Sequence, residues 1–302
     1  MVFKLISSAQ NEQYRLMVRA ASEPRFRRKH GYMWIEGQRL VLDFLARADS
    51  LGSRWQPVAL VVSESLQASD SARQASLQCA ALDREPAQLV LTDALYGGLS
   101  QLVHGPGMAL LTQLNGLADD ATSDGSMNLA AATGRLPAAG SGQPGLPDVV
   151  LLDRVSDPGN LGGLLRSAAA AGCRQAWLMK GSAEAHSPKA LRAGMGAQFG
   201  MVIREDLEMD QLAQAMAEIG GQLVLTVAAD NSGAVSLHQA SWLGDRAPLV
   251  WAFGQEGSGL SSTLFAWPAA RALTIDQSDT VESLNVNAAA AVCLFERRRR
   301  LA

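Results

Sequence analysis

The order of apolar and polar runs divides the chain into two stretches in which strands and helices alternate. In the second stretch, short apolar runs bounded by turn residues predict strands at 149–153, 175–179, 222–228, 249–254 and 272–275. Segments with helical periodicity separate them, at about 160–171, 187–197, 207–219 and 283–300. This alternation predicts a parallel sheet covered by helices on both faces. Ligands are therefore expected beyond the carboxyl ends of its strands.

The first hundred residues predict a smaller α/β unit. Helical periods occur in NEQYRLMVRAAS and WIEGQRLVLDFLARA, and strand-like runs in QPVALVVSES, QLVLTD and GMALLTQL. From about 115 to 147 the chain becomes rich in Gly, Ala, Ser, Asp and Pro, which is typical of a flexible linker. We therefore predict one domain over 1–113, a linker over 114–147 and a second domain over 148–302.

Composition narrows the class of protein. A chain of 302 residues that is 48% hydrophobic is long enough to bury two cores. It has no apolar run long enough for a transmembrane helix, and its N-terminus turns polar too early for a secretory signal. Cys79, Cys173 and Cys293 are far apart, which predicts buried thiols in a reducing cytoplasm. The four histidines do not cluster, so no metal centre is expected.

The net charge of −3 conceals two basic segments. The first contains six cations against one acid, Glu23; these cations are Arg15, Arg19, Arg25, Arg27, Arg28 and Lys29. The second is the run of four arginines at 297–300. Such segments bind phosphate backbones electrostatically even when the total charge is slightly negative. The alternatives are a solvated loop at 25–30 and cations that complement the dipole of a C-terminal helix.

The stretch LDRVSDPGNLGGLLRSAAAAG, at 152–172, is the first candidate for chemistry. A strand ends in a Pro-Gly turn, and Asn160 is expected to cap the helix that follows. The leucines of this helix share the face that packs on the sheet, while Arg166 points to the opposite side, beside Gly162 and Gly163. Bare backbone beside a guanidinium suits an anion such as phosphate. The alternative is an exposed helix arginine with no partner.

Two further stretches follow predicted strands near the C-terminus. LVWAFGQEGSGLSS contains a glycine turn at 254–259, but it lacks both the dinucleotide and the P-loop patterns. Glu256 in this turn either holds an arginine in a bidentate pair or is solvated. SLNVNAAAAVCLFERRRR opens a helix with Ser283 and Asn285. Their hydroxyl and amide groups are expected beside the glycine turn if the two strands are neighbours.

These stretches, in this order, resemble a known family. DPGNLGGLLRSAAAAG, FGQEGSGL and VESLNVNAAAAVCLFE resemble the three motifs of the SpoU (TrmH-like) RNA 2′-O-ribose methyltransferases of the SPOUT superfamily, and SPKALRAGMGAQF resembles the segment between the first two. The N-terminal region resembles, more loosely, an L30e-like substrate-binding domain. The resemblance implies an α/β protein with a trefoil knot in its C-terminal parallel-sheet domain, a smaller N-terminal α/β domain, and a homodimer.

The resemblance also implies an activity and a site. The activity is S-adenosylmethionine-dependent methylation of a ribose 2′-hydroxyl in a structured RNA, ribosomal in preference to transfer RNA. The catalytic or site-shaping positions are Arg166, Asn160, Glu256, Ser283 and Asn285. The cofactor-binding positions are Thr226, Gly254, Gly257, Ile275 and Leu284. The cations at 15–29 would bind the RNA backbone outside the site. Glu256 would orient Arg166, which would clamp a phosphate and stabilise the 2′ oxyanion.

The chain departs from the family pattern at three places. The loop before the third motif, usually Ile-Pro-Met-x-Gly, reads Ile-Asp-Gln-Ser-Asp at 275–279. Asn287 and Gly194 each stand where a serine is usual. The altered loop favours one alternative, a non-catalytic RNA-binding protein with a relic methyltransferase domain, which a cofactor titration would distinguish. A third reading, a nucleotide- or NAD-using α/β enzyme, is disfavoured by the missing fingerprints.

Overall fold

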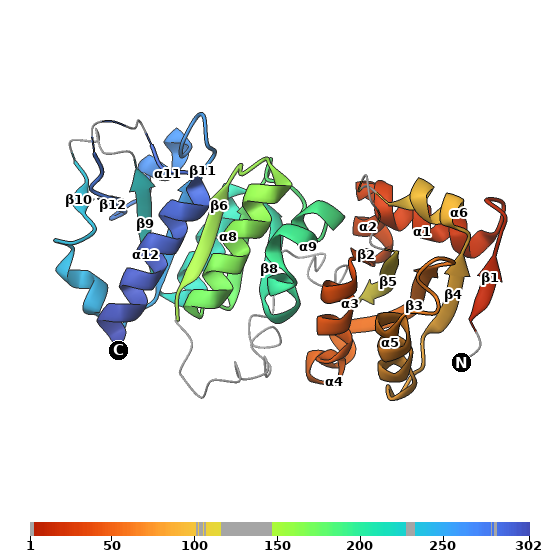
Figure 1. Cartoon of the computed structure of the whole chain (residues 1–302). Coiled ribbons are helices and arrows are strands. Elements are labelled where there is room, and N and C mark those ends of the chain that lie inside the picture. Colours follow the sequence, from red (N-terminus) through yellow and green to blue (C-terminus); the bar gives the residue numbers. More distant parts are fainter. Residues whose placement is uncertain are drawn as a thin grey trace. The chain divides into compact units, whose positions relative to one another are not determined.

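The structure, a computed structural model, divides the chain into two compact units (Figure 1). It describes residues 3–100, 102, 105, 107–115, 147–227, 233–278, 280 and 283–302. The N-terminal unit contains the described residues up to 115 together with His186–Phe199, and the C-terminal unit contains 147–185 and the described residues from 200 onward. Nearly all of the predicted linker lies outside the described residues.

The C-terminal unit is built on a seven-stranded sheet within the described residues. Its strands are β6 (Val149–Asp153), β7 (Gln175–Met179), β8 (Val202–Leu207), β9 (Gln222–Val227), β10 (Val235–Ser236), β11 (Leu249–Gly254) and β12 (Arg271–Thr274). They lie in the order β10-β12-β9-β11-β6-β7-β8, and each neighbouring pair is parallel. This confirms the predicted parallel sheet, while β8 and β10 were not predicted.

Helices cover both faces of this sheet because alternate strand residues point to opposite sides. They are α8 (Pro158–Ala171), α10 (Met209–Ile219), α11 (Ser262–Phe265) and α12 (Val286–Leu301). Leu151 and Leu225 share one core cluster with Leu212 of α10 and Leu264 of α11. Helix α12 lies beside α8 and also packs on β11 (Figure 1). The trefoil knot that the resemblance implies stays a prediction.

The N-terminal unit is a mixed five-stranded sheet within the described residues, between two layers of helices. The strands β1 (Lys4–Ile6), β4 (Ala87–Leu91) and β3 (Trp55–Ser63) are parallel, whereas β5 (Met108–Leu114) runs antiparallel to β3 and to β2 (Tyr32–Glu36). One core cluster includes α1 (Glu12–Ser22), α2 (Pro24–His30) and α6 (Asp93–Leu99). The other includes α3 (Gln38–Leu45), α4 (Ala48–Leu51) and α5 (Asp70–Ala80). The predicted small α/β unit is therefore present.

Helix α9 (Pro188–Gly194) differs from the predicted domain boundary. It follows β7 in the chain, yet it belongs to the N-terminal unit. Leu191 and Phe199 are buried in the core cluster that α3 and α5 form. Arg192 Nη1 lies 3.1 Å from Oε2 of Glu36, whose side chain is fully buried. Helical periodicity shows that one face of a segment is buried but not which core receives it, so the sequence placed this segment in the second domain.

The three cysteines are free and buried, as predicted. Burial raises the pKa of the Cys79 thiol and of the Cys293 thiol to about 12, and it raises that of Cys173 further. They are therefore uncharged core thiols. Among the described residues, no helix is long and apolar enough to cross a membrane, and no group of three His, Cys, Asp or Glu could hold a metal ion.

Candidate active site

The loops that carry the motifs leave the sheet at one edge. Because β12, β9, β11 and β6 are parallel neighbours, their carboxyl ends lie together. Thr274 pairs with Val227, and Gly254 pairs with Asp153, so these four strand ends are in register. An edge where loops converge beyond parallel strands is where α/β sheets bind ligands.

The side chain of Asn160 connects the three motifs. Its Nδ2 donates a hydrogen bond to Glu256 Oε1 at 2.5 Å. Its Oδ1 accepts from Nδ2 of Asn285 and from Nδ2 of Asn287, each at 3.4 Å. Three of the five predicted catalytic positions therefore meet in one hydrogen-bonded group. Asn287, which the sequence marked only as a departure from the family pattern, is the fourth member.

Asn160 is not the helix cap that the sequence predicted. The carboxylate of Asp157 caps α8, accepting the N–H of Asn160 at 2.8 Å. Pro158 occupies the first turn, where its fixed φ suits a helix and its missing N–H leaves no donor unsatisfied. The helix therefore begins two residues earlier than predicted, and this leaves the Asn160 amide available to join the loops.

Arg166 lies further along α8 and is exposed. It makes no hydrogen bond or ion pair with another residue that the structure describes, so the predicted pair with Glu256 is not formed within this chain. The physical reason is the rise of the helix, which places Arg166 about 9 Å along the axis from Asn160. Glu256 reaches the first turn and is bonded there. The guanidinium of Arg166 is thus a cation available to a ligand.

The glycines beside Arg166 serve packing rather than ligand approach. A Cβ on Gly163 would lie 2.5 Å from Nδ2 of Asn287, and Gly162 is buried. The bare backbone therefore admits the first turn of α12 against α8. This corrects the sequence-based interpretation, which assigned that space to an anion.

The glycine turn at 254–259 is closed at its base and open at its tip. A Cβ on Gly254 would come within 2.5 Å of the Gly259 carbonyl oxygen and of the Leu260 nitrogen. The Gly259 N–H donates back to the Gln255 carbonyl at 2.8 Å. At Gly257, by contrast, an added Cβ would meet nothing within 4 Å. Gly254 is thus required by the turn itself, whereas Gly257 leaves space beside the sheet edge.

The predicted cofactor positions lie along this edge. Thr226 Oγ1 donates to the Ala252 carbonyl at 2.5 Å, which joins β9 to β11. Ile275 follows β12 directly and is half-buried, while Leu284 is exposed. The altered loop between them is held by a side chain: Ser236 Oγ, on β10, donates to Asp276 Oδ2 at 2.5 Å. Asp279 lies outside the described residues.

Three buried polar atoms near this edge have no hydrogen-bond partner among the described residues. They are Thr274 Oγ1 at the end of β12, Gln277 Oε1 in the loop, and Asn287 Oδ1 in the first turn of α12. Buried polar atoms in folded proteins are almost always paired. Unpaired acceptors and a hydroxyl at one edge therefore fit a polar ligand.

The third motif opens α12 differently from the prediction. Asn285 is the cap, and its Oδ1 accepts the N–H of Asn287 at 2.9 Å. The helix begins at Val286 instead of 283. Ser283 precedes the cap, is exposed, and makes no hydrogen bond to another described residue. Its hydroxyl is therefore not needed to start the helix.

The cations of the basic N-terminal segment lie on two helices, α1 and α2, rather than in a loop, and one of them is structural. Arg27 is buried and donates to the carbonyls of Ala20 at 2.8 Å and Ala21 at 3.1 Å. It lies on the inner face of α2, so its predicted contact with RNA is wrong. Arg19 Nε lies 3.2 Å from Glu23 Oε2 in an ion pair, and the Arg19 guanidinium lies over the Phe26 ring. The exposed cations are Arg15, Arg19, Arg25, Arg28 and Lys29.

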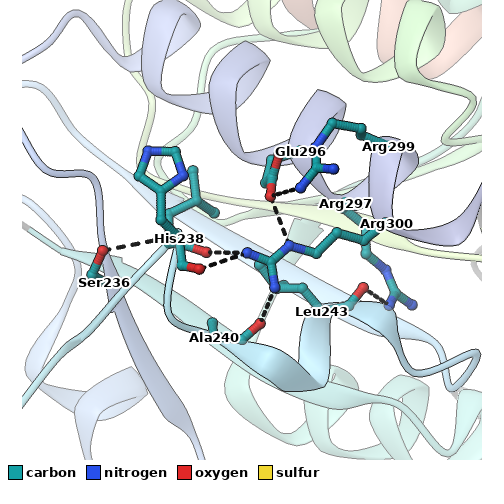
Figure 2. Close-up of polar contacts among 9 residues, drawn as sticks. Ser236, His238, Ala240, Leu243, Glu296, Arg297, Arg299 and Arg300 are labelled. Atoms are coloured by element: carbon teal, nitrogen blue, oxygen red, sulfur yellow. Dashed lines mark hydrogen bonds and ion pairs between the residues drawn. The ribbon is translucent and has the colours of Figure 1, made fainter.

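The arginines at the C-terminus are also structural rather than a basic patch. Arg297 is fully buried; its Nε and Nη2 lie 3.0 and 3.2 Å from the two oxygens of Asp148. Arg300 donates to the carbonyls of His238 and Ala240 at 2.9 Å and to Glu296 (Figure 2). Hydrogen bonds from Arg299 and Arg300 lower the pKa of Glu296 to about 2. We call Arg297 and Arg300 the arginine clamp; it ties the end of α12 to the loop before β11.

Comparisons with known proteins agree with this architecture. Residues 147–295 match the SpoU rRNA methylase family. An uncharacterized tRNA/rRNA methyltransferase of Synechocystis sp. is 35% identical over 152 residues, which are 50% of this chain and 53% of that protein. The 23S rRNA (guanosine-2′-O-)-methyltransferase of Bordetella pertussis is 33% identical over 152 residues, 50% of this chain and 59% of its own. The chain thus spans about half the length of the curated relatives it matches.

A solved structure extends the likeness to both units. The crystal structure of an AdoMet-bound rRNA methyltransferase from Sinorhizobium meliloti covers 99% of each chain with a TM-score of 0.73, at 24% identity. At that identity the likeness shows the shared fold alone. Three observations therefore agree: the sequence motifs match the family, residues of all three motifs are hydrogen-bonded at Asn160, and the fold is shared. Through residues 147–295, the chain belongs to the SpoU rRNA methylase family.

Proposed function

We propose that this protein methylates a ribose 2′-hydroxyl of a structured RNA, using S-adenosylmethionine. Ribosomal RNA is the proposed substrate in preference to transfer RNA, and the cytoplasm, where buried thiols stay reduced, is the proposed location. The observation that carries the proposal is that Asn160 is hydrogen-bonded to both Glu256 and Asn285. Asn160 lies on the same helix as Arg166. Family membership and the name of the Bordetella relative support the same reaction.

The carboxyl edge of the sheet suits the cofactor. The backbone at Thr226, Gly254, Ile275 and Leu284 would hold it, and the open position at Gly257 gives it room. The unpaired buried atoms of Thr274 and Gln277 fit its polar groups. When bound, S-adenosylmethionine supplies an electrophilic methyl group on a sulfonium. No dinucleotide or P-loop pattern is present, which disfavours the alternative of a nucleotide- or NAD-using enzyme.

The residues of this chain supply position and charge. An arginine keeps its proton in proteins, so Arg166 acts as a cation rather than a base. It clamps a phosphate next to the acceptor ribose and stabilises the developing 2′ oxyanion. The proton passes to water, to a phosphate or to a neighbouring group. Asn160 holds Glu256 and Asn285 in place. The Ser283 hydroxyl, which is exposed, would position the ribose and the cofactor loop.

The proposal is tested by methyl transfer to defined RNA pools. The purified protein is incubated with radiolabelled S-adenosylmethionine and with deproteinised ribosomal or transfer RNA from cells lacking the gene. We expect label in ribosomal RNA at a 2′-O position, mapped by resistance to alkaline cleavage. Cofactor binding without transfer to either pool would instead support a non-catalytic RNA-binding protein. Label on a base would overturn the assignment of the acceptor atom.

We further propose that the exposed cations of α2 bind the RNA backbone outside the site. Replacing Arg25 and Lys29 together by alanine is expected to weaken RNA binding several-fold. It should also reduce the slope of log affinity against log salt by about 0.7–0.9 for each lost phosphate contact. S-adenosylmethionine affinity, measured calorimetrically, should not change.

The matched control removes two cations from the other helical layer of the same unit. Arg73 and Arg84 are exposed, and α5, which carries Arg73, packs in the core cluster on the opposite side of the sheet. Their double alanine variant has the same net charge as the α2 variant. Equal losses of RNA affinity in the two variants would contradict a specific α2 contact.

We also propose that the protein forms a homodimer, in which a partner copy covers an exposed apolar stripe on α12. Val292 and Phe295 are 41% and 47% exposed, and Ala288 lies on the same face. Leu284, before the helix, is 39% exposed. A continuous apolar helix face in water favours association. The stripe continues from the candidate site, so a partner copy seated on it would lie beside that site.

Charge placed in this stripe should prevent association. We expect Phe295→Asp to sediment as a monomer at micromolar concentration, where the wild-type protein sediments as a dimer. Phe265→Asp is the control, because Phe265 is 46% exposed on α11. A wild-type monomer, or a Phe295→Asp dimer, would show that the stripe is not the interface.

A further inference from the structure

Arg154 has an unusual backbone conformation at the candidate site. It directly follows β6 and has φ 59°, in the left-handed region that side-chain-bearing residues rarely adopt. A glycine would adopt this conformation without strain. Strained residues of this kind cluster at functional sites, where the surrounding structure holds them. Here the strain lies at the carboxyl end of the strand that pairs with β11.

The side chain of Arg154 is held by a buried carboxylate. Its Nε donates to Asp153 Oδ1 at 3.2 Å, and the Asp153 side chain is only 3% exposed. The other oxygen, Oδ2, accepts the N–H of Ser261 at 2.5 Å. Ser261 follows the glycine turn at 254–259. One carboxylate therefore fixes both Arg154 and the base of that turn.

The outer edge of the Arg154 guanidinium is available to a ligand. The side chain is 39% exposed, and its terminal nitrogens make no hydrogen bond to another described residue. A guanidinium has five N–H donors, and Asp153 engages only the one on Nε. The two terminal nitrogens, Nη1 and Nη2, form a planar fork, which matches two oxygens of a phosphate.

We propose that Arg154 binds a backbone phosphate of the RNA beside the acceptor ribose. This inference rests on the proposed function and adds a second phosphate-binding position to it. Arg154 starts the loop that leads into α8, and Arg166 lies on that helix, so the two cations belong to one strand-to-helix unit. Arg154 is a positioning residue: it places the RNA chain and takes no part in methyl transfer.

The test compares two variants with the same loss of charge. Arg154→Ala removes the cation at the carboxyl edge of the sheet. Arg246→Ala removes an exposed cation just before β11, at the amino edge of the same sheet. Binding of deproteinised ribosomal RNA is measured by filter retention between about 50 and 200 mM KCl. We expect Arg154→Ala to lower affinity several-fold and the salt slope by about 0.7–0.9, and Arg246→Ala to change neither.

Arg154→Gly separates binding from folding. Glycine removes the backbone strain at φ 59°, so its melting temperature should equal or exceed that of Arg154→Ala. Its RNA affinity and salt slope should nevertheless fall as far as those of Arg154→Ala. S-adenosylmethionine affinity should stay at the wild-type value in both variants.

Each outcome decides the matter. An unchanged salt slope in both Arg154 variants overturns the proposal, and so does a loss of cofactor affinity with RNA binding intact. If the wild-type protein transfers no methyl group but the slopes fall as expected, the proposed function fails and the phosphate contact stands. If methyl transfer occurs and the slopes do not move, only the contact at Arg154 fails.

Discussion

Replacing Arg297 by alanine is expected to lower the free energy of unfolding by about 3–5 kcal/mol. The fully buried Asp148 carboxylate also accepts from the Leu249 N–H at 3.1 Å and from Trp251 Nε1 at 2.9 Å. Without the guanidinium, its charge remains buried and loses its counter-ion. The carbonyls of Leu243 and Ala247, each 2.7 Å from an Arg297 nitrogen, would also lose their donor. Urea unfolding followed by circular dichroism measures the change.

The neighbouring Arg299 provides the control. Its guanidinium is 69% exposed and pairs with Glu296 on the same helix. Such surface pairs contribute less than about 1 kcal/mol, so Arg299→Ala should be nearly neutral. A double variant, Asp148→Leu with Arg297→Met, should recover part of the stability, because it removes both buried charges but leaves the Leu249 N–H, Trp251 Nε1 and the loop carbonyls unpaired. Similar losses for Arg297→Ala and Arg299→Ala would show that the arginine clamp does not stabilise the fold.

The second large effect is expected at Arg166. Arg166→Lys should lower the turnover of methyl transfer by roughly 100-fold or more, the magnitude typical of losing one donor that stabilises a developing oxyanion. Lysine keeps the charge but loses the planar fork that contacts phosphate and oxyanion together. The dissociation constant of S-adenosylmethionine should stay the same, because Arg166 is not among the proposed cofactor positions. Steady-state kinetics at saturating cofactor, with calorimetry of cofactor binding, separate the two quantities.

Two controls make the Arg166 result specific. The melting temperature of Arg166→Lys should equal that of the wild-type protein, because Arg166 is exposed and unpaired among the described residues. Arg246→Lys makes the same exchange at an exposed arginine at the opposite edge of the sheet and should leave turnover unchanged. An equal loss of turnover and of cofactor affinity in Arg166→Lys would argue against its role at the acceptor.

Much of the fold could be predicted because buried strands have a direct signature in sequence. Runs such as VVLL at 149–152 and LVWAF at 249–253 are apolar at every position because helices cover both faces of the sheet. Strand β8 is harder to recognise, because VIREDL contains charged residues, and one of them, Arg204, is buried against Glu218. The charged residues interrupt the apolar run, so no strand was predicted there. Burial beside a counter-ion, which the sequence does not show, makes it a strand.

The sequence predicted which residues lie at the candidate site, but it did not predict which of them form hydrogen bonds with one another. Motifs at strand ends placed Asn160, Glu256 and Asn285 at one edge, and the structure joins them. The predicted partner of Glu256 was Arg166, because charge suggested it. The actual partner is Asn160, because the rise of α8 puts it within reach. Which side chain a carboxylate meets depends on distances between segments far apart in the chain.

By itself, the sequence determined where most of the strands and helices form, which of their faces are buried, and which motifs follow a strand. Those properties depend on neighbours within a few residues, and hydrophobic periodicity records them directly. Only the tertiary structure decided that Arg297 lies in the core with Asp148, that α9 packs in the N-terminal unit, and that Asn287 fills the space over Gly163. Such pairings are made between segments that the chain separates widely, and their energy depends on distance and burial, which no local pattern specifies.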